Sequence, residues 1–182
     1  MTKASEKSGL PRQLRVYRAG ESLDFEAVIE PGHEIAAGDR EGMAKAHNAG
    51  WNDGMTVRVI LVDEKSGFNL THLWMKPFYK LPNHSHSVDC AYYVVSGEAH
   101  MGVNVLKPGD SFMVPANCLY TYSAGPEGCE VIEFRNIVDY TFRIGSHPKT
   151  HWEKAVKTAQ ANAANWRVAE PPLSAARVLK QA

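Results

Sequence analysis

The stretch that decides the fold runs from residue 82 to residue 97 and reads Pro82-Asn-His84-Ser-His86-Ser-Val-Asp-Cys90-Ala-Tyr92-Tyr-Val-Val-Ser-Gly97. Its centre is a His-x-His pair, His84 and His86. On a β-strand, residues two positions apart point to the same face, so both imidazoles would face one point. Such a pair can supply two neighbouring ligands to a divalent metal, although an isolated pair more often only bonds its neighbours. The surrounding sequence has to decide between these interpretations.

Short β-strands are predicted on both sides of this stretch. Runs of β-branched and aromatic residues alternate with Gly, Pro, Asp and Ser at intervals of about 8–12 residues, which is the pattern of an all-β sandwich or barrel. The predicted strands cover residues 55–62, 68–75, 91–95, 111–114, 130–134 and 140–143, and the run at 91–95 is expected to end at Ser96-Gly97. We therefore place the barrel over residues 55–145.

The segment before the barrel differs in texture. Residues 1–54 mix short apolar pieces with Gly and charge, and contain a possible helix over 41–48. The polar residues up to Pro11 are typical of a loose tail. We expect residues 1–54 to form an N-terminal arm that packs on the barrel or on a partner subunit.

The segment after the barrel, residues 146–182, is predicted to contain a helix and a tail. Residues 150–166 are rich in Ala, place apolar side chains at helical spacing, and begin with Thr150-x-x-Glu153, a capping-box pattern. Pro171-Pro172 is expected to end regular structure. Two histidines near the start of the helix, His147 and His151, are expected to have a surface or capping role.

The overall charge gives no reason to expect a polyanionic partner. Twenty Lys and Arg balance twenty Asp and Glu, so no global field attracts nucleic acid or anionic lipid. No apolar run approaches the roughly 18–20 residues that span a bilayer, and the first residues lack the apolar centre of a secretory signal. The three cysteines, an odd number without paired spacing, are typical of reduced thiols. We therefore expect a cytoplasmic protein that binds neither nucleic acid nor membrane.

The motifs of the chain resemble those of the cupin superfamily. The first cupin motif, Gly-x5-His-x-His-x3-4-Glu-x6-Gly, matches at His84, His86 and Gly97. The second, Gly-x5-Pro-x-Gly-x2-His-x3-Asn, matches at Gly109 and Pro115. The resemblance covers about residues 57–134 and implies an all-β, jelly-roll-like double-stranded β-barrel, with the N-terminal arm and the C-terminal helix outside it. It also implies a homodimer, because cupins often pair through such arms.

Two ligand positions of the cupin motifs carry other residues. The position of the glutamate holds Cys90, and that of the third histidine holds Tyr120. Asp89 should face outward, because neighbouring strand residues alternate. If a divalent metal (iron, zinc, copper, nickel or manganese) is retained, we expect it on His84, His86, Cys90 and Tyr120, or with His72 of the preceding strand as a third nitrogen. If the metal site is lost, the pocket would hold a small molecule through hydrogen bonds from His and Tyr.

Strand parity predicts further pocket residues. Tyr92 shares parity with Cys90, and Tyr122 with Tyr120, so these side chains should look inward, either as pocket lining or as core. We assign catalytic roles to Tyr92 and Tyr120, because a phenol beside a metal can act as an acid or a base. The residues expected to bind substrate are Tyr92, Tyr122, Phe112, Met101 and Trp74.

Two classes of function stay open at this point. The resemblance implies a small metalloenzyme for a small organic substrate, most often a mononuclear iron dioxygenase, although isomerases and lyases also occur among cupins. The absence of the motif glutamate and of the third histidine favours a metal-free cupin that binds a small ligand as a sensor or carrier. A resemblance in fold does not choose between these functions.

Overall fold

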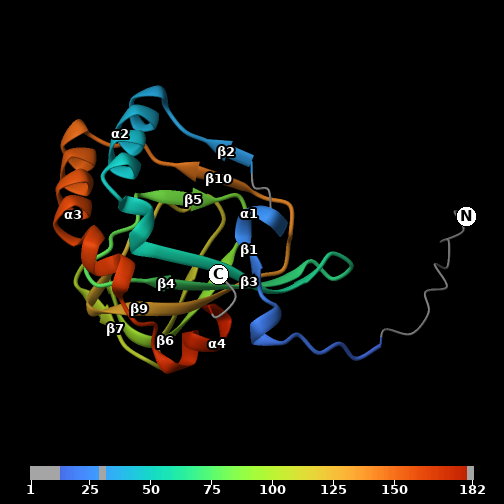
Figure 1. Ribbon diagram of the computed structural model, residues 1–182. Coiled ribbons are helices and arrows are strands. Elements are labelled where there is room, and N and C mark those ends of the chain that lie inside the picture. The colour runs from blue at the N-terminus through green and yellow to red at the C-terminus, as the bar shows by residue number, and fades with distance from the viewer. Residues whose placement is uncertain (1–12, 29–31, 180–182) are drawn as a thin grey trace, which may run out of the picture.

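The computed structural model describes residues 13–28 and 32–179, and shows two β-sheets that face each other, with helices at the sides (Figure 1). The tail predicted up to Pro11 lies outside the described residues. Over the described part, most strands are antiparallel, and the all-β barrel that the sequence predicts is confirmed.

The larger sheet runs in the order β1 (Leu23–Asp24), β3 (Met55–Asp63), β4 (Phe68–Met75), β9 (Ser123–Arg135), β6 (Cys90–Met101) and β7 (Asn104–Leu106), and β8 (Ser111–Val114) also pairs with β6. The smaller sheet runs in the order β2 (Gly32–Glu34), β10 (Thr141–Ile144) and β5 (His84–His86). Only the β2–β10 pairing is parallel among the strand pairs described.

The strand predicted to end at Ser96-Gly97 continues to Met101. Its pairing with β9 shifts register between Val94 and Ser96 and again between Gly97 and Ala99, so the turn signal in the sequence marks β-bulges instead of an end. Gly97 has φ +68°, and a Cβ atom there would lie 2.1 Å from the Gly128 carbonyl oxygen. The bulge therefore requires glycine at this position.

Alternation along β4 and β9 separates an inner from an outer face. Leu73 faces the space between the two sheets, while its neighbour His72 lies on the outer face with Nε2 2.8 Å from Glu130 Oε1. The hydroxyl of Ser174, in helix α4 (Leu173–Leu179), also bonds Glu130, so α4 covers this outer face. His72 is therefore unable to supply the third nitrogen considered from the sequence, because its side chain points away from the barrel interior.

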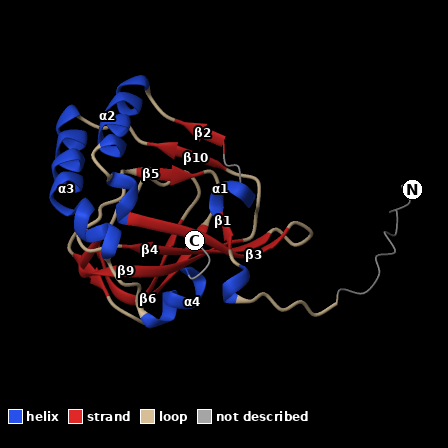
Figure 2. Cartoon of the chain, viewed as in Figure 1, coloured by secondary structure: helices blue, strands red, loops and turns tan. Residues whose placement is uncertain are grey.

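The long helices lie together at one side of the barrel (Figure 2). Helix α2 (Ala37–Asn48) packs against α3 (Lys149–Val168), and a Cβ atom on Gly42 would lie 2.3 Å from the Trp152 ring. The apolar face predicted for α3 is confirmed, since it buries Trp152, Ala159, Ala163 and Trp166. The other helical segments are the short α1 (Phe25–Val28) and the 3-10 turns at Ala19–Glu21 and Trp51–Gly54.

Two expectations for the C-terminal segment are wrong. Helix α3 begins at Lys149 with Pro148 as its N-cap and no side-chain cap bond, so Thr150 does not form the predicted capping box. Regular structure also does not end at Pro171-Pro172, because α4 follows directly and the amides of Ala175 and Ala176 bond the Pro172 carbonyl. None of the helices in the described ranges has the length and apolar character needed to cross a bilayer.

Candidate functional site

A cavity of about 430 Å³ lies between the two sheets. One part of its wall is apolar, formed by Phe25, Met55, Val57, Leu73, Leu81 and Phe142. The other part is polar and aromatic, formed by His84, His86, Tyr92, Tyr120, Tyr122, Glu133, Arg135 and Tyr140, with Asp24 also contributing. The cavity therefore offers a small molecule both apolar contacts and hydrogen-bonding groups.

The paired histidines reach the polar side from β5. This three-residue strand pairs with β10, and the backbone of His84 exchanges two hydrogen bonds with Tyr120 at 3.0 and 2.9 Å. The two imidazole ring centroids lie 5.3 Å apart. Burial lowers the pKa of His84, and lowers that of His86 to about 3, so both rings are neutral and keep a lone pair for a ligand.

A charged pair that the sequence motifs do not predict lies at the centre of the site. Glu133 and Arg135 project inward from β9, on the same face of the strand as the fully buried Val131. Arg135 donates to Glu133, and its guanidinium carbon also lies 4.4 Å from the centre of the Tyr140 ring. Burial alone would raise the pKa of Glu133, but the charge of Arg135 and the neighbouring His86 and Tyr92 outweigh it and hold that pKa below its usual value. Glu133 is therefore a buried carboxylate with its own counter-ion.

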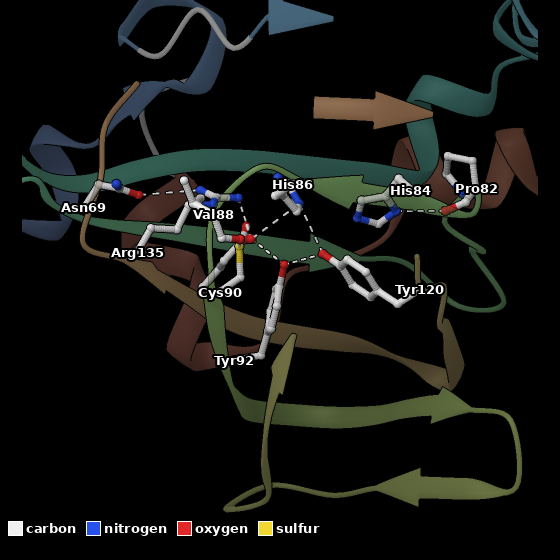
Figure 3. A network of polar contacts seen from close by, with 10 residues as sticks. Asn69, Pro82, His84, His86, Val88, Cys90, Tyr92, Tyr120 and Arg135 are labelled. Carbon is white, nitrogen blue, oxygen red and sulfur yellow. Dashed lines mark hydrogen bonds and ion pairs between the residues drawn. The ribbon is translucent and has the colours of Figure 1, made fainter. Parts of the chain in front are cut away.

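A chain of hydrogen bonds connects His86 to this carboxylate (Figure 3). His86 Nε2 lies 3.2 Å from the Tyr120 hydroxyl, which bonds the Tyr92 hydroxyl, and Tyr92 in turn donates to Glu133. Burial raises the pKa of both phenols well above 10, so the two tyrosines are protonated. The arrangement therefore forms a continuous path for protons from His86 to Glu133.

Cys90 completes a group of possible metal ligands. One donor atom each from His86, Cys90 and Glu133 lies within 4.8 Å of the others, and all three residues are buried. Burial raises the pKa of the Cys90 thiol to about 12. Asp89, the neighbour of Cys90, is exposed as predicted and accepts the Ala116 amide at 2.7 Å. Three strands, β5, β6 and β9, each contribute one donor to this group.

The remaining predicted ligands lie beside this group. His84 lines the cavity, but its Nδ1 bonds the Pro82 carbonyl at 2.9 Å, and the residue is outside the three-donor group. Tyr120 stands next to His86 through its hydroxyl. Glu133, which the motif comparison did not reach, supplies the carboxylate. A sequence signal was present, because Val131, Glu133 and Arg135 have one parity and place two charges on the inward face of a strand.

The predicted substrate residues divide into two sets. Tyr92 and Tyr122 line the cavity, whereas Trp74, Met101 and Phe112 are not among the described residues that line it. Trp74 follows Leu73 and so lies on the outer face of β4, where the Lys76 ammonium lies 5.1 Å from its ring. Phe112 stacks behind Tyr92 at a centroid distance of 4.5 Å. Met101 ends β6, beyond both bulges.

The comparisons with known proteins find similarity among solved structures, each with a TM-score below 0.5. No family model matches the sequence, and no curated protein matches it. Among solved structures, an RmlC-like cupin from Shewanella frigidimarina is 26% identical, with a TM-score of 0.41 over 45% of this chain and 75% of that one. A cupin-like protein from Thermotoga maritima is 21% identical, with a TM-score of 0.46 over 56% of this chain and 84% of that one. The polyketide cyclase RemF from Streptomyces resistomycificus is 18% identical, with a TM-score of 0.47 over 60% of this chain and 84% of that one.

The deciding observation is the architecture itself, in which two facing sheets enclose a pocket and the His-x-His strand β5 lines it. The chain has the cupin fold. Within this cupin barrel, the position of the motif glutamate is taken by Cys90 and that of the third histidine by Tyr120, while the carboxylate comes from Glu133 on β9.

The donor set of this cupin fits a divalent cation. Imidazole, thiolate and carboxylate are ligands that zinc and other transition metals accept. The three donor atoms lie within 4.8 Å of one another, and bonds of about 2.0–2.3 Å in tetrahedral geometry would bring them to about 3.3–3.8 Å. His86 also has a buried Nδ1 without a hydrogen-bond partner in the described part of the chain. One feature opposes a cation, since the Arg135 guanidinium stands directly beside Glu133.

Proposed function

We propose that this chain is a cupin enzyme that holds a divalent metal on His86, Cys90 and Glu133 and acts on a small organic substrate in the adjoining cavity. The observation that carries the proposal is the convergence of these three donors at the polar side of a 430 Å³ cavity. A bound divalent metal would supply a Lewis acid, or a redox centre if it is iron, copper or manganese. His84, which lines the cavity beside His86, is placed to contact a bound substrate.

The protein groups around this centre are suited to move a proton. Tyr120 can accept a proton from a substrate while its own proton passes to Tyr92, whose proton passes to Glu133. The same transfers in the opposite order return the proton to the substrate. Arg135 keeps Glu133 ionised in the resting state, and the lowered pKa of Glu133 favours return of the proton to the tyrosines. These roles agree with the catalytic assignment of Tyr92 and Tyr120 from the sequence.

Dioxygenase chemistry is the finer form of this proposal. It requires a redox-active metal, and we expect iron if it is correct. Oxygen consumption in the presence of candidate substrates, measured with the metal-loaded protein, tests it. A zinc protein without oxygen uptake would instead favour the isomerase or lyase form, in which only the proton path and a Lewis acid are needed.

A second candidate function has one observation in its favour. Arg135 already neutralises Glu133, so the site is charge-balanced without a cation. On this alternative, the cavity is the binding site of a metal-free sensor or carrier, and the paired histidines act as hydrogen-bonding groups. A small-molecule partner is common to both proposals. The homodimer remains a prediction, which light scattering on the purified protein tests.

The deciding experiment is elemental analysis of protein purified without a histidine tag or chelator. Two matched pairs of variants sharpen it: Glu133→Gln against Glu130→Gln, and Cys90→Ser against Cys129→Ser. Each pair compares two buried residues of one type, and only the first member belongs to the donor group. We expect near-stoichiometric metal in the wild type and both controls, and a strong loss in Glu133→Gln and Cys90→Ser. A wild type that carries no metal and takes up none on reconstitution would leave the metal-free alternative.

A further inference from the structure

The charges that line the cavity cancel each other before any ligand enters. Three lining residues other than histidine can carry charge, namely Asp24, Glu133 and Arg135. Glu133 pairs with Arg135, and Asp24 pairs with Arg58 from β3. Arg135 and Glu133 are both almost fully buried, so solvent screens their charges little. Any further charge brought to this site has to find its counter-charge inside the cavity.

A divalent metal on His86, Cys90 and Glu133 disturbs this balance. The ion adds two positive charges, and the Cys90 sulfur removes one of them if it binds as a thiolate and none if it binds as a thiol. At least one positive charge is therefore left over in either state. An uncompensated buried charge is costly, so the metal would bind more strongly together with an anion.

Two neighbouring residues that line the cavity carry polar groups without partners in the described part of the chain. Arg135 Nε and the Tyr140 hydroxyl are buried, belong to lining residues, and have no hydrogen-bond partner within the described ranges. Both are donors, and they are neighbours, because the Arg135 guanidinium lies over the Tyr140 ring. Two adjacent donors beside a positive centre suit a carboxylate. The apolar lining residues suit a carbon skeleton, for which Leu73 and Val57 provide contacts.

We propose that the substrate of this site is a small organic acid, whose carboxylate is received by Arg135 and Tyr140 and whose apolar body lies against the apolar lining residues. This anion and the metal tighten each other's binding. The inference rests on the proposed metal-dependent function and names its substrate class. Reciprocity is required by thermodynamics, since the factor by which the acid tightens the metal must equal the factor by which the metal tightens the acid.

The test uses isothermal titration calorimetry on the full chain with Zn²⁺, benzoate and the neutral analogue benzamide. We expect benzoate to bind at least tenfold more tightly to the Zn²⁺-loaded protein than to the metal-free protein. The affinity for Zn²⁺ should rise by the same factor when benzoate is present. Benzamide should change neither affinity in this way. Tyr140→Phe removes a hydroxyl that has no partner among the described residues, so the variant should fold normally. It should weaken benzoate binding about tenfold, as expected for the loss of a bond to a charged group. Tyr93→Phe, at an exposed outer position, is the control and should bind as the wild type does.

The outcomes separate the two proposals. If the wild type takes up no Zn²⁺, the proposed function and this inference fall together. Zn²⁺ uptake without mutual tightening by benzoate, or with equal tightening by benzamide, overturns the substrate class and leaves the metal site standing. Linkage that Tyr140→Phe does not weaken would overturn the assignment of the carboxylate to this side of the cavity.

Discussion

Asp39 Oδ1 lies 3.0 Å from His147 Nδ1, and this contact joins the N-terminal arm to the segment that follows the barrel. His147 in turn contacts Asn83, the residue before the paired histidines. The opposite ring nitrogen of His147 accepts the amide of Asn83 at 2.8 Å, so His147 is neutral and donates from Nδ1 to the carboxylate. Trp152 Nε1 donates to the same Asp39 oxygen at 2.8 Å. The surface role expected for His147 is therefore wrong, because its side chain is 5% exposed.

Replacing Asp39 by Ala should destabilise the protein strongly. Three buried donors, two from His147 and one from Trp152, lose their acceptor together. We expect a loss of about 3 kcal/mol in the free energy of unfolding, measured by urea titration. Asp39→Asn keeps one acceptor oxygen and should retain most of this stability. Asp53→Ala breaks a more exposed pair with Arg167 and should cost less than about 1 kcal/mol. Equal losses for the two alanine variants would contradict this account.

The Glu133–Arg135 pair should show strong coupling in a double-mutant cycle. Glu133→Gln leaves the Arg135 charge buried without a counter-ion, and we expect it to lower the free energy of unfolding by about 3–5 kcal/mol in the metal-free protein. The double variant Glu133→Gln/Arg135→Met removes both charges and should be more stable than the single variant. Chemical denaturation in the presence of chelator measures both. Additive losses would argue against the pair as a buried ionic unit.

The pH dependence of stability should carry a contribution from His86. Its folded-state pKa is lowered to about 3 from the ordinary value of 6.5 by burial, so between these values the unfolded chain binds the proton and the folded chain does not. The contribution to stability is therefore full above pH 6.5 and is lost as the pH falls toward 3, by at most about 1.4 kcal/mol per pH unit. His86→Gln should flatten the curve measured by urea unfolding of metal-free protein, and His100→Gln, at a half-exposed position, should leave it steep.

Two buried phenols should respond oppositely to removal of the hydroxyl. Tyr92 bonds both Glu133 and Tyr120, so Tyr92→Phe should cost about 1–3 kcal/mol of unfolding free energy. The Tyr122 hydroxyl has no hydrogen-bond partner in the ranges that the structure describes, and Tyr122→Phe should be neutral or slightly stabilising. Thermal denaturation of the two variants side by side makes the comparison. A larger loss for Tyr122→Phe would reverse the expected order.

The barrel could be predicted because its signals are local. Alternating residues bounded by turn residues gave β3, β4 and β8 almost to their ends, and the motif spacing placed Cys90 on the inner face of β6. The bulges of β6 could not be predicted, because the dipeptide Ser96-Gly97 is equally typical of a turn. Helix α4 is not predicted from the sequence, because Pro171-Pro172 indicates the end of regular structure. Proline is also favoured at the start of a helix, and α4 begins directly after Pro172.

The site was predicted only in part, because half of it depends on distant segments. Glu133 lies well outside both motifs, and only its register against Tyr92 on β6 brings it to the cavity. The contact of Asp39 with His147 spans 108 positions of the chain, and neither residue belongs to a recognisable pattern. Parity predicted which side chains point inward, but it could not predict which of them would share a hydrogen bond.

The arm crosses from one sheet to the other, since β1 extends the large sheet beside β3 and β2 extends the small sheet beside β10. The arm therefore connects the two sheets through its own strand pairings. A chain shortened to begin at Met55 would expose unpaired backbone on β3 and β10 together, and such edges pair readily with those of other molecules. The arm and the barrel are thus one folding unit, and cutting between them should yield aggregates instead of a smaller soluble cupin.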